Sequence, residues 1–517
     1  MKNRRIRNAA ILASVVLLLV NFVVNPYSIF GPIASTEAKL DRSDYEALLE
    51  SYGSVDAALE QILADADSDF FGGYAVDETF LSWLYGAYGW DAIVDLAYQM
   101  YEGNREDNLW YEITGSTMHV LWLSYCKHMG IYEEDWQDVI WQEESGDSDG
   151  TVTIDFVGDI CFDADWYPME AKNETADAFS DCFSEEVLAE LNGADITVVN
   201  NEFTYTTEEE SLSGKAYTFK ADPVNVGLLK VLGTDLVALA NNHVYDYGEA
   251  GLIDTLETLE EAGYPYMGAG RNIEEASKIV YYVVNGRKIA FVNGTEIERY
   301  SNYTQAASDN TAGVLKFLDP EVMLRTIAEA DANSDYVIVY AHWGVEGRVY
   351  YDSSSEAYAE MFAEAGADAI IGGHPHRLQG VSFVDNVPVA YSLGNFWFSD
   401  ASLYATIAQI TIDASGELSL RMLPCVQSNL QVTMLTEEAD LKGFYEYLAD
   451  ISTDVVFDET GKVYDLTALD EQGEPVYQLE DYPYASGQKY YTWTNETDLD
   501  GYVMDIIGNR TADTDEE

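Results

Sequence analysis

The chain has 517 residues and carries 92 acidic side chains against 26 basic ones, a formal net charge of −66. A surface of this charge repels nucleic acid and anionic lipid headgroups, which excludes a polyanion held by surface charge alone. The length predicts more than one domain, and 38 Tyr, 19 Phe and 10 Trp exclude a disordered acidic tail. The acidity itself has a simple explanation, the solubility of an exported protein.

The N-terminus has the pattern of an export signal. Lys2, Arg4, Arg5 and Arg7 precede an apolar run over residues 9–24. The positive-inside rule places everything after this segment outside the cytoplasm. We therefore expect a signal-anchor segment over residues 1–35 and a single-pass cell-membrane protein whose bulk is extracytoplasmic. A cleaved signal, which would make the protein secreted, is the alternative.

The cysteines do not predict a metal site. Cys126, Cys161, Cys182 and Cys425 form no C-x-x-C pair. One or two disulfide bridges outside the cell are compatible with this count, and the sequence does not give their pairing.

Beyond the anchor, the pattern divides into three regions. Residues 36–147 show apolar positions at helical spacing and predict a helical N-terminal domain. Residues 148–430 alternate short β-branched runs with helical stretches, which predicts an α/β domain. Residues 431–517 predict a helix followed by an acidic, Tyr-rich extension. The expected strands of the α/β domain are 151–157, 196–199, 236–240, 289–292, 336–341, 369–371, 387–391, 404–412 and 418–424, and the expected helices from residue 148 onward are 251–262, 320–332, 355–365 and 439–451.

Six of these strands end in residues of the metal-binding type. The strand-end segments are 158–159 (GD), 200–202 (NNE), 241–243 (NNH), 342–346 (HWGVE), 372–376 (GGHPH) and 392–396 (SLGNF). Ligands of open α/β sheets bind at the carboxyl ends of the strands. Four of the six histidines lie in these segments, which packing alone does not explain. The sequence therefore predicts a site for one or two divalent ions, and imidazole with carboxylate ligands favours Mn, Zn or Fe.

The motifs resemble those of a known family. They are 156–160 (FVGDI), 201–202 (NE), 215–223 (KAYTFKADP), 240–248 (ANNHVYDYG), 268–271 (GAGR), 342–346 (HWGVE), 373–376 (GHPH) and 392–396 (SLGNF). In this order they are similar to the CapA-like poly-γ-glutamate capsule biosynthesis proteins, within the metallophosphatase-like superfamily. The resemblance covers about residues 151–400 and implies a four-layer α/β/β/α sandwich.

The resemblance also implies roles for individual residues. The metal ligands would be Asp159, Glu202, Asn242, His342, His374 and His376, with Glu202 bridging two ions. His243, oriented by Asp246, would act as the catalytic acid near the leaving group. One departure weakens the first metal position: the Asp-x-His of common metallophosphatases is here Asp159 followed by Ile160 and Cys161.

Several polar residues within or beside the motifs are candidates for substrate binding: Lys215, Arg271, Glu346, Arg348 and Asn395. Charge balance in acidic surroundings explains the basic ones equally well. The resemblance suggests a metal-dependent hydrolase or transferase that acts on an amide or phosphoester of an anionic surface polymer. A non-catalytic membrane subunit for polymer synthesis, export or anchoring, working with other capsule subunits, is the first alternative. A general exported metallophosphoesterase is the second, and no nucleic-acid partner is expected.

Overall fold

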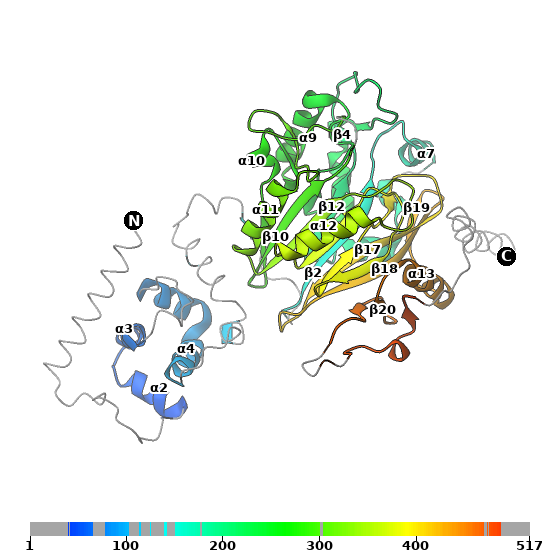
Figure 1. Cartoon of the computed structure of the whole chain (residues 1–517). Helices are drawn as coiled ribbons and strands as arrows, with labels where there is room; N and C mark the ends of the chain where they lie inside the picture. Colours follow the sequence, from blue (N-terminus) through cyan, green and yellow to red (C-terminus); the bar gives the residue numbers. More distant parts are fainter. Residues whose placement is uncertain are drawn as a thin grey trace. The chain divides into compact units, whose positions relative to one another are not determined.

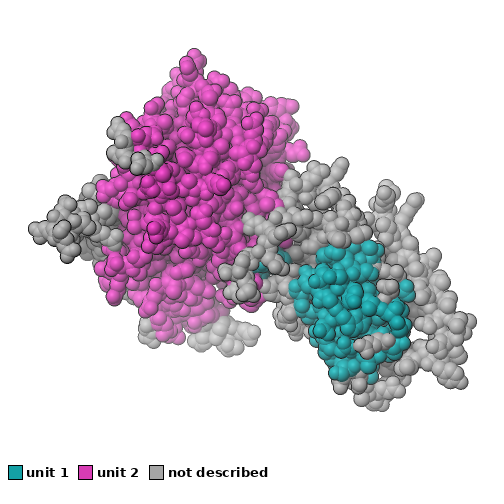
Figure 2. Space-filling view, turned by 180° about the vertical axis from the view of Figure 1, so that it is seen from behind, with its two compact units in different colours: residues 1–138, 285–287 teal, residues 139–284, 288–517 magenta. Residues whose placement is uncertain are grey.

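The computed structural model describes residues 40, 42–65, 78–102, 113–114, 125, 139–141, 150–175, 178–299, 303–469, 473 and 475–487. The chain divides into two compact units, residues 1–138 with 285–287 and residues 139–284 with 288–517 (Figure 2). The expected anchor at 1–35 lies outside the described residues. Within the described part of the chain, no helix is long and apolar enough to cross a membrane.

The first unit is helical in its described residues. Its main helices are α2 (Arg42–Glu50), α3 (Val55–Asp65) and α4 (Glu78–Glu102). Leu49, Leu59 and Phe80, one from each helix, are buried in a common core. Gly89 interrupts α4 with a φ of 82°, a conformation that glycine adopts without steric cost.

The helical region ends earlier than the sequence predicted. Residues 139–141 lie inside the region predicted as helical, but they form strand β1 (Val139–Trp141). This strand pairs in parallel with β9 (Val280–Val284), and the second unit begins at residue 139. Its Val-Ile-Trp sequence is β-branched and aromatic, which suits a strand better than a helix.

Two sheets build the second unit (Figure 1). The seven-stranded sheet has the order β1, β9, β10 (Arg287–Thr295), β12 (Tyr336–His342), β13 (Ala369–Gly373), β15 (Val387–Ala390), β14 (Val381–Val384). The eight-stranded sheet has the order β19 (Gln431–Met434), β18 (Leu418–Ser428), β17 (Leu403–Ile412), β2 (Val152–Ile160), β3 (Ile196–Asn201), β6 (Leu236–Ala238), β7 (Tyr266–Met267), with β16 (Asn395–Trp397) beside β2.

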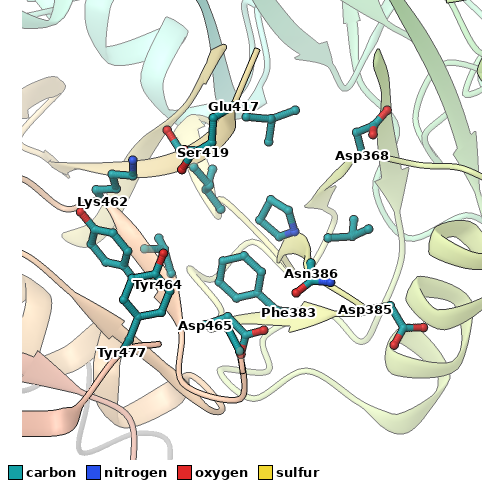
Figure 3. Close-up of a pocket in the computed structure, with 16 residues that line it drawn as sticks. Asp368, Phe383, Asp385, Asn386, Glu417, Ser419, Lys462, Tyr464, Asp465 and Tyr477 are labelled. Atoms are coloured by element: carbon teal, nitrogen blue, oxygen red, sulfur yellow. The ribbon is translucent and has the colours of Figure 1, made fainter. Parts of the chain in front are cut away.

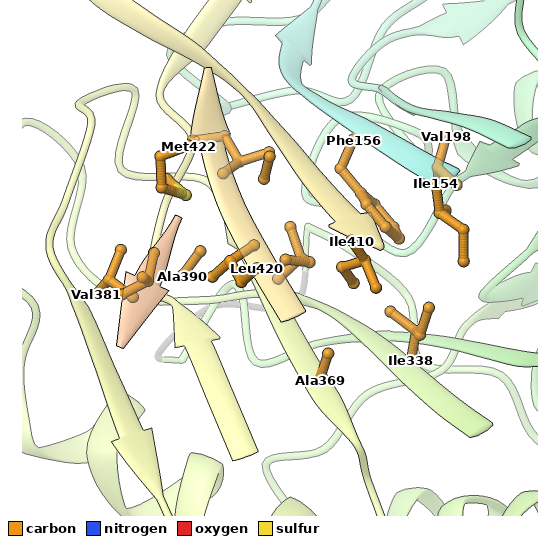
Figure 4. Close-up of a cluster of buried hydrophobic side chains, with 14 of the residues drawn as sticks. Ile154, Phe156, Val198, Ile338, Ala369, Val381, Ala390, Ile410, Leu420 and Met422 are labelled. Carbon is orange, nitrogen blue, oxygen red and sulfur yellow. The ribbon is translucent and has the colours of Figure 1, made fainter. Parts of the chain in front are cut away.

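A shared hydrophobic core joins the two sheets. Ile154 and Ile410 from the eight-stranded sheet meet Ile338 and Ala369 from the seven-stranded sheet in one buried cluster (Figure 4). Alternate residues of the same strands face outward, as strand geometry requires. Val292 and Val339 face outward in this way from the seven-stranded sheet.

Helices cover both outer faces. The outer face of the eight-stranded sheet is covered by α7 (Tyr167–Thr175), α8 (Glu185–Leu191), η3 (Pro223–Leu232) and α9 (Gly248–Ala262). The seven-stranded sheet is covered by α11 (Glu321–Asp331) and α12 (Ser353–Glu364). The unit is therefore a mixed α/β structure whose layers run helix, sheet, sheet, helix.

The region after residue 430 continues this fold. Strand β19 extends the eight-stranded sheet, and Phe444 and Leu448 of α13 (Glu438–Ile451) lie in the core between the sheets. A small sheet of β20 (Val455–Phe457), β21 (Val463–Asp465) and β22 (Tyr484–Ala485) follows. The expected boundary at 430/431 falls between two paired strands. The remaining short elements are η2 (Phe179–Cys182), β4 (Thr204–Tyr205), β5 (Lys220–Ala221), β8 (Ala269–Gly270), α10 (Ile273–Ala276), β11 (Gly313–Val314) and η4 (Leu479–Asp481).

Candidate metal centre

Polar side chains from both sheets meet at the carboxyl ends of their parallel strands. The metal-type ligand atoms form two groups, the first of Asp159, Glu202 and His376 and the second of Glu202, His342 and His374. Within each group these atoms lie within 4.8 Å of one another. Glu202 belongs to both groups, so one carboxylate stands where a ligand shared by two cations would stand.

Each of the two carboxylates has an oxygen that accepts no well-aligned hydrogen bond from the described residues. Asp159 and Glu202 are both fully buried, and these oxygens are Asp159 Oδ2, which has only the charged contact with His376, and Glu202 Oε1. Leaving a buried carboxylate oxygen unpaired is costly. A bound cation would relieve this cost, so the donor set fits a divalent metal ion.

In the first group, three acceptor oxygens surround the ring of His376. Its Nδ1 lies 2.8 Å from Asn395 Oδ1 and 3.1 Å from Asp159 Oδ2, and its Nε2 lies 3.7 Å from Glu202 Oε1. Asn395 therefore holds one of the possible ligands in place.

In the second group, two imidazoles converge on one amide oxygen. His342 Nε2 lies 2.7 Å and His374 Nδ1 3.2 Å from Asn242 Oδ1, and His342 Nε2 is also 3.4 Å from Glu202 Oε1. Such crowding of nitrogen and oxygen donors around one point is the arrangement that a metal ion needs.

Burial dominates the electrostatics of these groups. It lowers the pKa of His342 to about 3, and it lowers the pKa of His374 well below its ordinary value, so both rings are neutral and able to act as ligands at neutral pH. Burial, followed by the charge of Asp159, raises the pKa of Glu202 well above its ordinary value. Burial is also the largest effect on Asp159 and opposes its ionisation, but His376, His342 and Asn200 together hold the pKa of Asp159 below its ordinary value.

Two asparagines that the sequence prediction left out support the ligands. Asn200 Nδ2 donates to Asp159 Oδ1 over 2.8 Å and to Glu202 Oε2 over 3.3 Å. Asn241 Nδ2 in turn donates to Asn200 Oδ1 over 3.0 Å. Both were visible as neighbours of named ligands in the sequence, at 200–202 and 241–243. Partners of this kind fix the orientation of metal ligands.

The loop after β13 brings its histidines to the site through an unusual backbone. His374 and His376 have φ angles of 99° and 55°, a region that residues other than glycine rarely adopt. The strand end before them must be glycine, because a Cβ on Gly372 would lie 1.9 Å from the Tyr391 carbonyl oxygen. A Cβ on Gly373 would lie 3.0 Å from Asp159 Oδ1. Backbone strain of this kind is concentrated at functional sites.

Beside the two groups lies a third buried arrangement. Asp246 Oδ2 lies 2.7 Å from His243 Nδ1 and accepts from the Phe219 backbone N–H over 2.7 Å, while Asp246 Oδ1 is 2.6 Å from Lys215 Nζ. An ionised carboxylate only accepts, so Nδ1 of His243 carries a proton and Nε2 is the nitrogen left to exchange one. Burial lowers the pKa of His243, although the charge of Asp246 opposes this.

Comparisons with known proteins find similarity over about half of the chain. Residues 153–400 match the family described as "Bacterial capsule synthesis protein PGA_cap". The chain is 32% identical over 253 residues to the PGA biosynthesis protein CapA of Bacillus subtilis (strain 168), covering 48% of this chain and 64% of that protein. It is 37% identical over 191 residues to the capsule biosynthesis protein CapA of Bacillus anthracis, covering 36% of this chain and 44% of that protein.

Residues 153–400, just under half of the chain, are similar to this family and are here called the PGA_cap domain. The alignments leave about a third or more of these two relatives unmatched. Two solved structures, TT1561 of Thermus thermophilus and the 5′-nucleotidase of Candida albicans, overlap 52% of this chain, and 97% and 52% of their own chains. Their TM-scores of 0.30 and 0.31 and identities of 12% and 11% are too low to bear on the centre.

The residues of the PGA_cap domain that were expected to bind substrate differ in burial and in contacts. Asn395 is buried against His376, and Glu346 is exposed, with its charge acting on Glu202 and His376. The Lys215 amine donates to Asp246 and to the Asn242 carbonyl oxygen, so it positions residues of the centre.

The two arginines among these candidates are placed differently. Arg271 forms a two-pronged ion pair with Glu260, at 2.8 and 2.9 Å, and lies 3.4 Å from Glu275. None of these contacts of Arg271 is with a residue of the candidate metal centre. Arg348 is exposed, and its carbonyl oxygen accepts from Gln379. A cation that the sequence prediction did not name, Arg299, instead acts on the charge of His374.

The cysteines of the domain take no part in the centre. Cys161, Cys182 and Cys425 are buried and unbridged. No disulfide joins any two of these three, and Cys126 lies outside the described residues.

A separate hollow of about 400 Å³ lies at the other end of the strands (Figure 3). Asp368 lines it just before β13, whereas His374 follows the same strand at the metal-type centre. Phe383, Asp385 and Tyr464 also face this hollow, and none of the candidate ligands lines it.

Proposed function

We propose that the PGA_cap domain is a metal-dependent hydrolase or transferase that acts on an amide or phosphoester linkage during the synthesis of a capsular surface polymer. The observation that carries the proposal is the position of Glu202. Its buried carboxylate is common to two groups of ligand-type side chains and has an oxygen that accepts no hydrogen bond from the described residues. The printed names of the CapA relatives support the link to capsules and to poly-γ-glutamate.

The ligands proposed for the two positions follow the two groups. Asp159, Glu202 and His376 would hold one ion, and Glu202, Asn242, His342 and His374 would hold the other. A divalent ion in such a site supplies Lewis acidity and makes bound water a nucleophile at neutral pH. The metal identity proposed is Mn, Zn or Fe, from the mixture of imidazole and oxygen donors.

The protein's own contribution is proton transfer and exclusion of water. His243 would hold or move a proton at Nε2, and the bond from its Nδ1 to Asp246 would keep the ring in that orientation. Lys215 and the Phe219 N–H fix the Asp246 carboxylate in turn. The side chains of His342, Asp159 and Glu202 are inaccessible to solvent, and that of His376 is 15% exposed. A substrate would therefore approach from the His376 side.

The basic and apolar N-terminal sequence supports a location outside the cytoplasmic membrane, with residues 1–35 as the anchor. There the domain would meet the growing polymer and other subunits of capsule synthesis or export.

Metal content and turnover, measured together on the purified full-length chain in detergent, test the proposal. We expect bound Mn²⁺ or Zn²⁺ in the wild type, loss of that metal in His374→Ala, and turnover of poly-γ-glutamate or of a generic phosphodiester that disappears in His243→Ala. His243→Ala should keep its metal, because His243 is in neither ligand group. Bound metal without turnover of either substrate would favour the non-catalytic subunit. A wild type that binds no metal after reconstitution would refute the proposal.

A further inference from the structure

A polar atom with no partner among the described residues lies at the base of the candidate metal centre, outside both ligand groups. Tyr340 and His342 are two residues apart on β12, so their side chains lie on the same face of the strand. The Tyr340 ring packs against Phe156 in the core between the sheets, with 6.2 Å between the ring centroids. Tyr340 is fully buried, and its hydroxyl group is the unpaired atom.

Other tyrosines of the same core differ from Tyr340 in this respect. The hydroxyl groups of Tyr282, Tyr445 and Tyr447 donate to backbone carbonyl oxygens over 2.7, 3.2 and 3.1 Å. Buried polar groups are nearly always hydrogen-bonded, because an unpaired one has lost its bonds to water without replacement. The Tyr340 hydroxyl group therefore needs an explanation, and packing does not supply one, since phenylalanine would fill the same space.

The hydroxyl group faces a small space that it shares with Asp159. A Cβ built on Gly373 would lie 2.9 Å from the Tyr340 hydroxyl oxygen and 3.0 Å from Asp159 Oδ1. Because glycine has no side chain, residue 373 leaves this space between the two oxygens open. Burial, and after it the charges of Asp159 and Glu202, raise the pKa of Tyr340 well above its ordinary value, so the hydroxyl group lies near both carboxylates.

The unpaired atoms at this base are chemically complementary. The Tyr340 hydroxyl group is a donor without an acceptor, whereas Asp159 Oδ2 and Glu202 Oε1 accept no well-aligned hydrogen bond from the described residues. Asp159 Oδ1 accepts from Asn200 Nδ2 over 2.8 Å, and a carboxylate oxygen has room for a second donor. A carboxylate that binds a metal ion commonly accepts hydrogen bonds as well, and these fix its orientation.

We infer that Tyr340 is a positioning residue of the first ligand group. Its hydroxyl group donates to Asp159 Oδ1, directly or through one water molecule, when Asp159 Oδ2 binds a cation. This hydrogen bond holds the carboxylate in the orientation that the cation needs. The inference rests on the proposed function only in placing a divalent ion in the first ligand group, and it does not require turnover.

Metal affinity and thermal stability, measured on the same variant, test this role. Tyr340→Phe removes one oxygen and keeps the ring that packs against Phe156. Calorimetric titration of the metal-free full-length chain in detergent with Mn²⁺ should show an affinity at least about tenfold lower for one ion. Without metal, the Tm of the variant should equal that of the wild type or exceed it by about 1–4 °C, because no described group loses a partner. A residue that only packs would lower both the affinity and the Tm.

Tyr205→Phe is the matched control. Tyr205 is also fully buried, and its hydroxyl group also has no partner in the described part of the chain. It packs against Phe203 in the core on the outer face of the eight-stranded sheet, with 4.8 Å between the ring centroids. Removing its hydroxyl group should leave the Mn²⁺ affinity unchanged.

Three outcomes would overturn the inference: an unchanged Mn²⁺ affinity in Tyr340→Phe, an equal loss in Tyr205→Phe, or a lower Tm of metal-free Tyr340→Phe together with the loss of affinity. An unchanged affinity in a protein that binds metal and turns over substrate would leave the proposed function standing. A loss confined to Tyr340→Phe, in a protein that turns over neither test substrate, would support the inference and refute only the proposed catalysis. A wild type that binds no metal would overturn both.

Discussion

Carboxylates lie at both ends of the parallel strands of the second unit, but their hydrogen bonding differs between the two ends. At the amino ends, four aspartates each accept a backbone N–H from the neighbouring strand: Asp195 from Thr153 (2.7 Å), Asp235 from Thr197 (2.9 Å), Asp335 from Lys288 (2.7 Å) and Asp368 from Val337 (2.6 Å). The backbone N–H of each aspartate donates back to the carbonyl of the same partner. These carboxylates complete the hydrogen bonding of the sheets.

At the carboxyl ends, Asp159 and Glu202 each keep an oxygen that accepts no well-aligned hydrogen bond in the described part of the chain. Since buried polar groups are nearly always hydrogen-bonded, the exceptions need an explanation. The same residue type thus stabilises the fold at one end of a strand and is left available for chemistry at the other. Variants at the two ends can test this division.

The largest effect should come from removing the shared carboxylate. Glu202→Gln keeps the volume but loses the charge that both ligand groups use, so we expect metal affinity to fall by more than about 100-fold. Turnover of whatever substrate the wild type accepts should be lost with it. Titration with Mn²⁺ measures the affinity.

The matched control for that experiment is Asp368→Asn, at the opposite end of the strands. Its side chain keeps an acceptor for the Val337 N–H and lines only the separate hollow. It should bind metal like the wild type. Equal loss in both variants would show that the division between the two ends is wrong.

A carboxylate in mid-strand gives the second-largest effect, on stability. Asp155 is fully buried in β2; Gln409 donates to one oxygen and the other has no donor. Burial raises the pKa of Asp155 to about 8, with a further contribution from Glu190 and an opposing one from Arg421. Because the folded pKa lies above the unfolded one, the stabilising contribution of the protonated form is complete below about pH 4 and is lost as the pH rises through about 8.

Asp155→Asn removes this titration. Relative to the wild type, the variant should gain roughly 5 kcal/mol of unfolding free energy between pH 4 and pH 8. Urea denaturation at a series of pH values measures the difference. A difference that does not change with pH would mean that Asp155 is ionised in the folded protein.

A medium effect is expected from the asparagine that supports the ligands. Asn200→Ala removes the donors to Asp159 and Glu202, so metal affinity should fall by about 10- to 100-fold while the fold is kept. Asn333→Ala is the control, because its amide donates only to a helix carbonyl at the surface. If Asn200→Ala binds metal normally, the ligands are oriented by the backbone alone.

Most of the fold was accessible from the sequence because hydrophobic periodicity reports strands and helices directly. All nine expected strands and the four expected helices from residue 148 onward overlap elements of the structure. Strand β1 was missed because three apolar residues are too few to show a period, and its pairing with β9 connects segments about 140 residues apart. The region of the candidate site was visible because polar segments stand at strand ends, which parallel strands bring together, but the individual ligands came from the family resemblance.

The partners of individual side chains could not be predicted in the same way. Lys215 and Arg271 both lie in the motifs. Lys215 contacts Asp246, beside His243, whereas Arg271 contacts Glu260 on α9. Which carboxylate a long basic side chain reaches depends on tertiary neighbours, and in a chain with 92 acidic residues many candidates compete. Asn200 was overlooked for a related reason: an amide that supports ligands has no spacing rule of its own.

The smallest effect we predict is at Asp235, one of the four amino-end aspartates. Asp235→Ala loses the acceptor for the Thr197 N–H, which should lower the unfolding free energy by about 1 kcal/mol without changing metal affinity. Burial raises the pKa of Asp235 to about 6, so its charge is of little benefit near neutral pH. Asp235→Asn, which keeps an acceptor and carries no charge, should therefore restore the stability that Asp235→Ala loses. If Asp235→Asn is as unstable as Asp235→Ala, the charge of Asp235 and not its hydrogen bond stabilises the strand end. The difference between Asp235 and Asp159 would then lie in how their charges are compensated, not in their hydrogen bonds.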